Sequence, residues 1–232
     1  MKPIQEQPVA SESFLSHLWA SIAATVVLTI LVSGAYPLLV WGIAQMAFPH
    51  QANGSLVKKD GTFTIKDEEA VGSALLGQKF AAPQYFHPRP SAAGAGYDAT
   101  ASGGTNLGPI SDKFLNGVAD DPATKDVDES FAGVKQLIAA YRAENGLLES
   151  TLIPADAVTR SGSGLDPHIS PANAKLQLAR VAKARGQDEK ALSAIVDDYT
   201  DSPSLGILGE PGVNVLRLNL ALDAKYPAVA KK

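Results

Sequence analysis

The sequence predicts a single N-terminal transmembrane helix followed by one α+β domain, and three observations support this fold class. Between Glu12 and Lys58 the chain contains no Asp, Glu, Lys or Arg. After this gap the composition shifts to Gly, Pro, Ser and Asn, and then to segments with helical periodicity. A chain of 232 residues, 45% of them hydrophobic, is long enough for one ordinary core and a small second element.

The apolar run from Leu18 to Phe48 predicts the transmembrane helix. At 1.5 Å per residue, about 20 apolar residues cross the hydrocarbon layer, so one span fits and two spans with a turn do not. Trp19 and Trp41 suit the two membrane interfaces, and we expect Pro37 to kink the helix. A cleaved signal peptide is disfavoured because the run is too long and no clean cleavage site ends it.

The chain is therefore divided into three parts. The flanking charges do not orient the helix, because Lys2 lies on one side and Lys58 and Lys59 lie on the other. The three predicted parts are an N-terminal extension over residues 1–17, the transmembrane helix region over residues 18–48 and a soluble α+β domain over residues 49–232.

Short strands and ordered loops are expected at the start of the soluble domain. Residues 49–110 contain many turn-forming pieces such as QANGS, HPRPS and ASGGTNLGP. The piece KKDGT, Lys58 to Thr62, lies between SLV and FTI and carries the Asp-Gly pair typical of a hairpin.

Helices dominate the rest of the domain. Apolar spacing predicts a helix over residues 129–145, with a stop at Gly146. Capping residues predict a second helix that begins after Ser170 and ends at Gly186. A short helix is expected over Asp188 to Tyr199, and the segment that opens at Pro211 is interpreted as a final helix, although its periodicity also fits a strand.

Several classes of function are excluded or disfavoured by composition and motifs. The absence of cysteine removes disulfides, zinc-thiolate sites and thiol nucleophiles. The chain contains no block of Lys and Arg residues, so we do not expect a nucleic-acid-binding face. No phosphate-binding loop of the Walker type occurs, and the four histidines do not show metal-ligand spacing. We expect neither a metal site nor a catalytic site.

The stretch SGSGLDPHIS, residues 161–170, contains the residue types of a hydrolase site. Ser163, Asp166 and His168 are close in sequence, but no Gly-x-Ser-x-Gly elbow is present, and triads are usually assembled from distant segments. We interpret the stretch as a rigid surface loop held by its Gly, Pro, Asp and Ser residues. A membrane-tethered hydrolase that uses Asp166 and His168, and a binding module for an external small ligand, stay open as alternatives.

The run YFHPRP, Tyr85 to Pro90, combines aromatic residues and an arginine with prolines. Aromatic residues and arginine are favoured at contact surfaces. The run is equally compatible with a loop that closes the core.

Six pieces distributed along the chain form a recognisable set. The pieces are NGSL from Asn53, GSALLGQ from Gly72 with YFHPRPS from Tyr85, ASGGTNLG from Ala101, SGLDPHIS from Ser163, RVAKAR from Arg180 and VNVLRLNLALD from Val213. In this order they resemble a known family, the C subunit (KdpC family) of Kdp-type potassium-transporting P-type ATPases. The resemblance covers nearly the whole chain, and SGAYPL within the apolar run is also similar to the family pattern.

The resemblance implies a single-pass protein of the bacterial inner membrane with a cytoplasmic N-terminus and an extracytoplasmic (periplasmic or extracellular) domain. Its implied partners are a channel-like potassium-binding subunit, a P-type ATPase subunit and a small single-span subunit. Such a subunit is needed for assembly and activity of the potassium import pump without being its catalytic engine.

The resemblance also implies a catalytic-chaperone role, in which the C subunit raises the ATPase subunit's affinity for ATP. The nearest candidates for nucleotide contact are Gln78, Gly103 and Gly104. No firmly bound cofactor is expected, and an external domain does not meet cytoplasmic ATP.

Docking on the partner subunits is the main role predicted for specific residues. The small residues Ser33, Gly34 and Ala35 would let the membrane helix pack closely on a neighbouring span. The two rigid loops would dock on the channel-like subunit through Tyr85, Phe86, His87, Arg89, Asp166 and His168.

Overall fold

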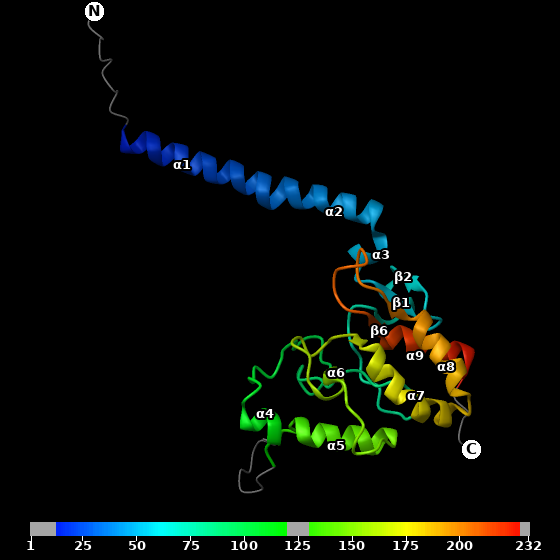
Figure 1. Ribbon diagram of the computed structural model, residues 1–232. Helices are drawn as coiled ribbons and strands as arrows, with labels where there is room; N and C mark the ends of the chain where they lie inside the picture. Colours follow the sequence, from blue (N-terminus) through cyan, green and yellow to red (C-terminus); the bar gives the residue numbers. More distant parts are fainter. Residues whose placement is uncertain (1–12, 120–129, 228–232) are drawn as a thin grey trace, which may run out of the picture. The chain divides into compact units, whose positions relative to one another are not determined.

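The computed structural model describes residues 13–119 and 130–227 (Figure 1). The chain divides into two compact units between Asn53 and Gly54. Most of the predicted extension over residues 1–17, and the first residue of the helix predicted over 129–145, lie outside the described residues.

The first unit contains one long apolar helix. It starts with α1 (Phe14–Thr29), whose N-cap Ser13 accepts a hydrogen bond from the Ser16 N–H, and continues through a π-helical turn (Ile30–Ala35) into α2 (Tyr36–Ala47). Over its 34 residues the mean hydropathy reaches 2.0 in the most apolar window, and no side chain in that window is buried. By length and composition this is the one candidate membrane span in the part of the chain that the structure describes.

The irregularity expected at Pro37 takes the form of a wide turn. The Tyr36 N–H donates to the Leu31 carbonyl five residues earlier, as in a π-helix. Proline clashes with the carbonyl four residues before it in a regular helix. Widening the preceding turn moves that carbonyl away, and the helix then continues as α2.

Hydroxyl groups in α1 are satisfied inside the helix. Ser21, Thr25 and Thr29 each donate to the backbone carbonyl four residues earlier, at 2.9, 2.8 and 2.7 Å. Lipid offers no hydrogen-bonding partner, so this back-bonding suits a helix that crosses a membrane.

The first unit ends in the short helix α3 (Pro49–Ala52). The Asn53 side-chain amide donates to the Gln45 Oε1 at 3.0 Å and to the Pro49 carbonyl at 2.7 Å. These bonds close the end of the unit against α2.

The second unit begins with the predicted hairpin, which is confirmed. Strands β1 (Leu56–Lys58) and β2 (Phe63–Thr64) are antiparallel, and β3 (Ala70–Ser73) pairs with the other edge of β1, so the sheet order is β2-β1-β3. The Asp60 carboxylate accepts the Thr62 N–H at 2.9 Å, and Gly61 takes the positive φ of +82° that the turn requires. A turn of 3-10 helix, Asp67–Glu69, precedes β3.

A second small sheet and three helices enclose the main core. Strands β4 (His168–Ile169), β6 (Gly212–Asn214) and β5 (Thr200–Asp201) are antiparallel in the order β4-β6-β5. The helices are α7 (Pro171–Arg185), α8 (Glu189–Asp198) and α9 (Val215–Lys225). Fully buried side chains from these elements include Ile169, Val181, Leu192, Val196, Val213, Leu218 and Leu222.

The predicted N-cap and C-terminal stop of α7 are confirmed. Ser170 Oγ accepts the Asn173 N–H at the start of α7, and Gly186 ends it with a φ of +63°. Asp188 caps α8 in the same way by accepting the Lys190 N–H.

A satellite cluster lies beside the main core. It joins α5 (Val134–Asn145), which ends at Gly146 as predicted, to α6 (Ala155–Val158) and to the outer side of α7. The short helix α4 (Asp112–Asn116) packs on α5. The helix predicted from residue 129 therefore begins at Val134.

The helix predicted from Pro211 is wrong in its first part. Residues Gly212–Asn214 form β6, and the helix α9 begins only at Val215. Val213 pairs with Ile169 on one side and Thr200 on the other, so β6 is the central strand of its sheet. Strand pairing between distant segments decided this stretch, whose periodicity fits both structures.

Candidate docking site

The loop over residues 161–170 is hydrogen-bonded to several other segments of the domain. Donors from these segments reach backbone carbonyls of the loop, which fits its interpretation as a fixed loop. The bonds include Gly77 N–H to the Leu165 carbonyl at 2.8 Å, Ser91 Oγ–H to the Gly164 carbonyl at 2.6 Å and Gly103 N–H to the Ser163 carbonyl at 2.9 Å.

A chain of charged groups crosses the end of this loop. Arg89 Nη1 lies 2.9 Å from one Asp166 oxygen, and the other Asp166 oxygen accepts the His168 N–H at 3.0 Å. His168 Nε2 lies 3.2 Å from the Asp201 carboxylate, which in turn lies 3.8 Å from Arg217 Nη1. Arg89, Asp166 and His168, which were predicted as docking residues, therefore lie together.

The geometry does not favour the hydrolase alternative. The Ser163 hydroxyl oxygen accepts the Leu165 N–H at 3.1 Å, and no Ser or Thr hydroxyl bonds to His168 among the residues that the structure describes. Within residues 13–119 and 130–227 no group of three or more His, Asp or Glu side chains is arranged to hold a metal ion.

An open cleft of about 570 Å³ borders these charged groups. Its walls come from the loop at 166–170, from β5 and from the segment between β5 and β6. The lining residues are Arg89, Asp156, Asp166, His168, Ile169, Ser170, Asp201, Ser202, Pro203, Ser204, Leu208, Glu210, Pro211 and Gly212.

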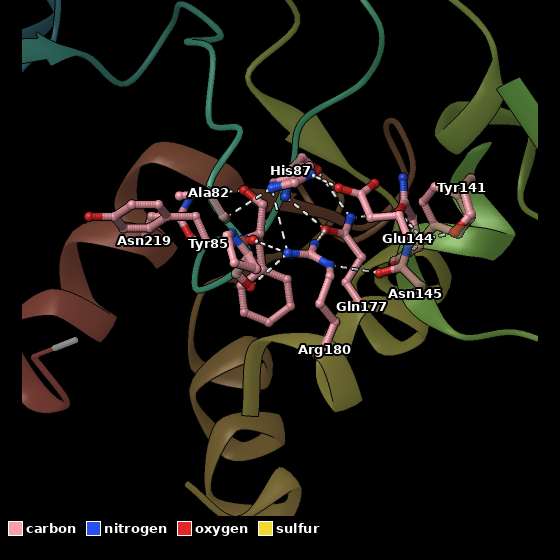
Figure 2. A network of polar contacts seen from close by, with 12 residues as sticks. Ala82, Tyr85, His87, Tyr141, Glu144, Asn145, Gln177, Arg180 and Asn219 are labelled. Carbon is pink, nitrogen blue, oxygen red and sulfur yellow. Dashed lines mark hydrogen bonds and ion pairs between the residues drawn. The ribbon is translucent and has the colours of Figure 1, made fainter. Parts of the chain in front are cut away.

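A half-buried arginine on α7, Arg180, ties the segment around Pro83–Tyr85 to α5 and α7 (Figure 2). Arg180 is the centre of this polar network, and burial lowers the pKa of its guanidinium. Its bonds run to the Pro83 carbonyl at 2.8 Å, the Tyr85 carbonyl at 2.9 Å, Asn145 Oδ1 at 2.9 Å and Gln177 Oε1 at 2.6 Å.

His87 bridges the same segment to α5. Its Nδ1 lies 2.8 Å from a Glu144 oxygen, and its Nε2 lies 3.1 Å from the Ala82 carbonyl, as Figure 2 shows. The hydrogen bond from His87 holds the pKa of Glu144 below its usual value, against the opposing effect of burial. The predicted docking residue His87 thus has an internal structural partner.

We expect Glu144→Gln to destabilise the domain at pH 6 and to have a smaller effect at pH 3. A carboxylate with a lowered pKa contributes stability above its unfolded-state pKa, and loses it as the pH falls through the folded-state value. Because Glu144 is partly exposed, the expected loss is below about 1 kcal/mol, or roughly 2 °C in Tm.

Calorimetry of the full chain in detergent at both pH values measures this difference. The control is Glu149→Gln, an exposed carboxylate outside the network. An equal loss at pH 3 would contradict the assignment of the effect to the charge of Glu144.

The side chains of Tyr85 and Phe86 face the interior. Phe86 is fully buried, and its backbone N–H and carbonyl are both bonded to the Asn219 side chain at 2.9 Å. The Tyr85 hydroxyl donates to Asp223 at 3.0 Å, and burial raises its pKa. Of the two interpretations of this run, core closure describes Phe86, whose side chain is not available to a partner.

The residues predicted to contact nucleotide flank the loop at 161–170 from two sides. Gln78 lies beside β3, where its Nε2 donates to the Val71 carbonyl at 3.3 Å. Gly103 uses its N–H on the loop, and a Cβ on Gly104 would lie 2.8 Å from the Gly162 carbonyl oxygen. Nucleotide contact stays a prediction for these three residues.

The small residues predicted for helix packing lie on the π-helical turn. Ser33, Gly34 and Ala35 occupy its last three positions. No atom lies within 4 Å of the position that a Cβ on Gly34 would take. A neighbouring helix would therefore find a shallow surface here.

A family model described as "K+-transporting ATPase, c chain" (KdpC) matches residues 18–224. The chain belongs to the KdpC family. The match includes both the apolar helix and the domain, so the resemblance seen in the sequence is confirmed.

Individual KdpC relatives are similar over almost their whole length. The "Potassium-transporting ATPase KdpC subunit" of Caulobacter vibrioides is 51% identical over 218 residues, which cover 94% of this chain and 98% of the relative. The protein of the same name from Mycobacterium tuberculosis is 48% identical over 207 residues, covering 89% and 97%.

Sequence reasoning missed two features of this KdpC family member. It did not assign roles to the half-buried Arg180 and the buried Arg185, although RVAKAR carried part of the family resemblance. It also passed over the segment SPSLGILGEPG between β5 and β6, where apolar residues alternate with turn formers. That alternation is a signal for an exposed apolar turn.

Proposed function

We propose that this chain is the accessory, non-catalytic C subunit of an ATP-driven potassium import pump, needed for assembly and activity of the complex. The observation that carries the proposal is 51% identity over 98% of a relative named as a potassium-transporting ATPase subunit. Its proposed partners are a channel-like potassium-binding subunit, a P-type ATPase subunit and a small single-span subunit.

The polar contacts of the domain support a positioning role. Arg89, Asp166, His168 and Arg180 each bond to protein groups that hold loops together. Side chains used in this way orient a surface for another protein. Growth of a bacterium on limiting potassium tests the proposal: deletion of this subunit should abolish growth that depends on the pump, and the intact chain should restore it.

We place the chain in the bacterial inner membrane with the N-terminus in the cytoplasm and the domain outside it. The candidate span supports a membrane protein, and the family resemblance supports the orientation. Because the chain contains no cysteine, single cysteines can test this placement. Glu149→Cys and Lys190→Cys, both at exposed positions, should react with a membrane-impermeant maleimide in intact spheroplasts.

A cysteine at Lys2 is the matched control for the opposite side, and should react only after lysis. Protection of both domain cysteines in intact spheroplasts would reverse the orientation.

The chaperone role is the finer part of this proposal. With the domain outside, an effect on ATP affinity would reach the ATPase subunit through packing of the membrane helix, and Gln78, Gly103 and Gly104 would not meet ATP. The reversed orientation would instead expose these three residues to cytoplasmic nucleotide. The labelling experiment therefore also decides whether an effect on ATP affinity would act through packing of the membrane helix or through direct contact with nucleotide.

We expect Gly34→Leu to reduce co-purification of this subunit with the detergent-solubilised pump by at least fivefold. The added side chain would separate the helix from a neighbour that approaches the small-residue turn. Gly42→Leu is the matched control, since a Cβ there also meets no atom within 4 Å. Retention of the Gly34 variant at the parent stoichiometry would refute the packing role.

A further inference from the structure

The segment between β5 and β6 forms a turn with an exposed apolar tip. The side chains of Leu205, Ile207 and Leu208 are 89%, 82% and 58% exposed. Three aliphatic side chains within four residues therefore present most of their surface outside the domain core. Clusters of this kind mark binding surfaces more often than isolated exposed residues do.

The tip is built to hold these side chains outward. Ser204 and Leu208 exchange both backbone hydrogen bonds at 2.9 Å, and the Ile207 N–H closes the turn on the Ser204 carbonyl. Leu205 has a φ of +55°, a conformation that glycine or asparagine adopts with less strain than leucine. The fold therefore places the apolar Leu205 at a position whose left-handed backbone conformation is unfavourable for leucine.

The tip is continuous with the open cleft, whose lining includes Asp156, Asp166, Asp201 and Glu210 and which we call the acidic cleft. Leu208 belongs both to the tip and to the cleft wall, and the adjacent rim residue Glu210 is exposed and forms no ion pair within the described residues. The Asp201 side chain is 54% exposed and lies 3.2 Å from His168 Nε2 and 3.8 Å from Arg217 Nη1. The surface beside the tip thus carries negative charge that the domain itself does not fully neutralise.

This combination fits a protein better than a lipid surface. Anionic lipid would be repelled by the acidic rim, and the turn from Ser202 to Glu210 contains no Lys, Arg, Trp or Tyr of the kind that holds loops at membrane interfaces. A protein can place an apolar pocket over the tip and a cationic side chain in the cleft.

We infer that the tip Leu205–Leu208 and the acidic cleft form one docking surface for a protein that presents an apolar pocket with an Arg or Lys at its rim. This inference rests on the proposed function, because the partner would be another subunit of the same pump. It moves the principal contact away from Tyr85–Pro90 to a segment that sequence reasoning did not select.

Leu205→Asn separates docking from folding. Asparagine accepts a positive φ, so we expect the Tm of the full chain to equal or exceed that of the parent. Combined with Ile207→Ser, it should lower the amount of this subunit that co-purifies with the pump at least fivefold. Leu152→Ser is the control, because Leu152 is 91% exposed elsewhere on the domain. Unchanged retention of the double variant would overturn the inference.

A crosslink identifies what lies at the tip. Ile207→Cys gives this cysteine-free chain a single thiol, which a maleimide–succinimidyl ester reagent can join to a nearby amine in the assembled pump. We expect an adduct with another subunit, at a lysine, and no such adduct from Leu152→Cys. An adduct with an aminophospholipid, or no adduct at all, would overturn the inference.

The experiments distinguish a failure of the proposed function from a failure of the proposed docking surface. If the unmodified chain does not co-purify with the pump, the proposed function is wrong. If it does and the tip variants behave as the parent does, only the docking surface is wrong.

Discussion

Replacing Arg185 by leucine is expected to lower the free energy of unfolding by about 3–5 kcal/mol, because it breaks a buried, hydrogen-bonded charge network. The Arg185 side chain has no exposed surface. Its Nε donates to the Gln84 carbonyl at 2.7 Å, Nη1 to the Tyr226 carbonyl at 2.7 Å and Nη2 to Asp223 at 2.9 Å. Leucine would leave two carbonyls without donors inside the domain.

Calorimetry of the full chain in detergent measures the effect, which corresponds to a fall in Tm of roughly 10 °C for a domain of this size. Arg185→Lys keeps the charge but loses the planar fork, so its effect should be intermediate. Lys183→Leu on the exposed side of the same helix is the control. A loss for Arg185→Leu no larger than that of the control would contradict the network's role.

Gly164→Ala is expected to destabilise the domain by about 2–4 kcal/mol, because strain and overpacking add at this position. The φ of Gly164 is +69°, where an L side chain is unfavourable. A Cβ would also lie 2.7 Å from the Ala93 backbone nitrogen and 2.8 Å from the Gly103 carbonyl oxygen. Relief of these contacts would push apart the segments that meet on the loop at 161–170.

Gly186→Ala separates the two causes. Gly186 has a similar φ of +63°, but no atom lies within 4 Å of its Cβ position. Its substitution should cost only the backbone strain, about 1 kcal/mol. Equal losses of Tm for the two variants, measured by calorimetry, would show that the close contacts at Gly164 relax without cost.

Much of the fold could be predicted because its signals are local. The apolar run, the Asp-Gly hairpin and the caps at Ser170, Gly186 and Asp188 depend on residues within one turn of each other. The start of α9 could not be predicted, because β6 exists only through its pairing with two distant strands. The candidate site could be predicted only in part for the same reason.

The contacts at the site connect residues far apart in the chain. Arg180 bonds to the Pro83 carbonyl across 97 residues, and Arg89 meets Asp166 across 77. No periodicity or spacing encodes which of these polar groups will face each other. The sequence therefore indicated Arg89 and Asp166 as candidates without indicating that they form a pair.

The sequence by itself determined the class of this protein: one apolar helix long enough to span a membrane, an α+β domain and the motifs of the KdpC family. Only the tertiary structure decided how the candidate residues are used. It buries Phe86, occupies His87 and Arg180 with internal partners and leaves Leu205 and Ile207 exposed. The physical reason is that helix formation and membrane insertion depend on neighbouring residues, whereas burial and charge pairing depend on which distant segments pack together.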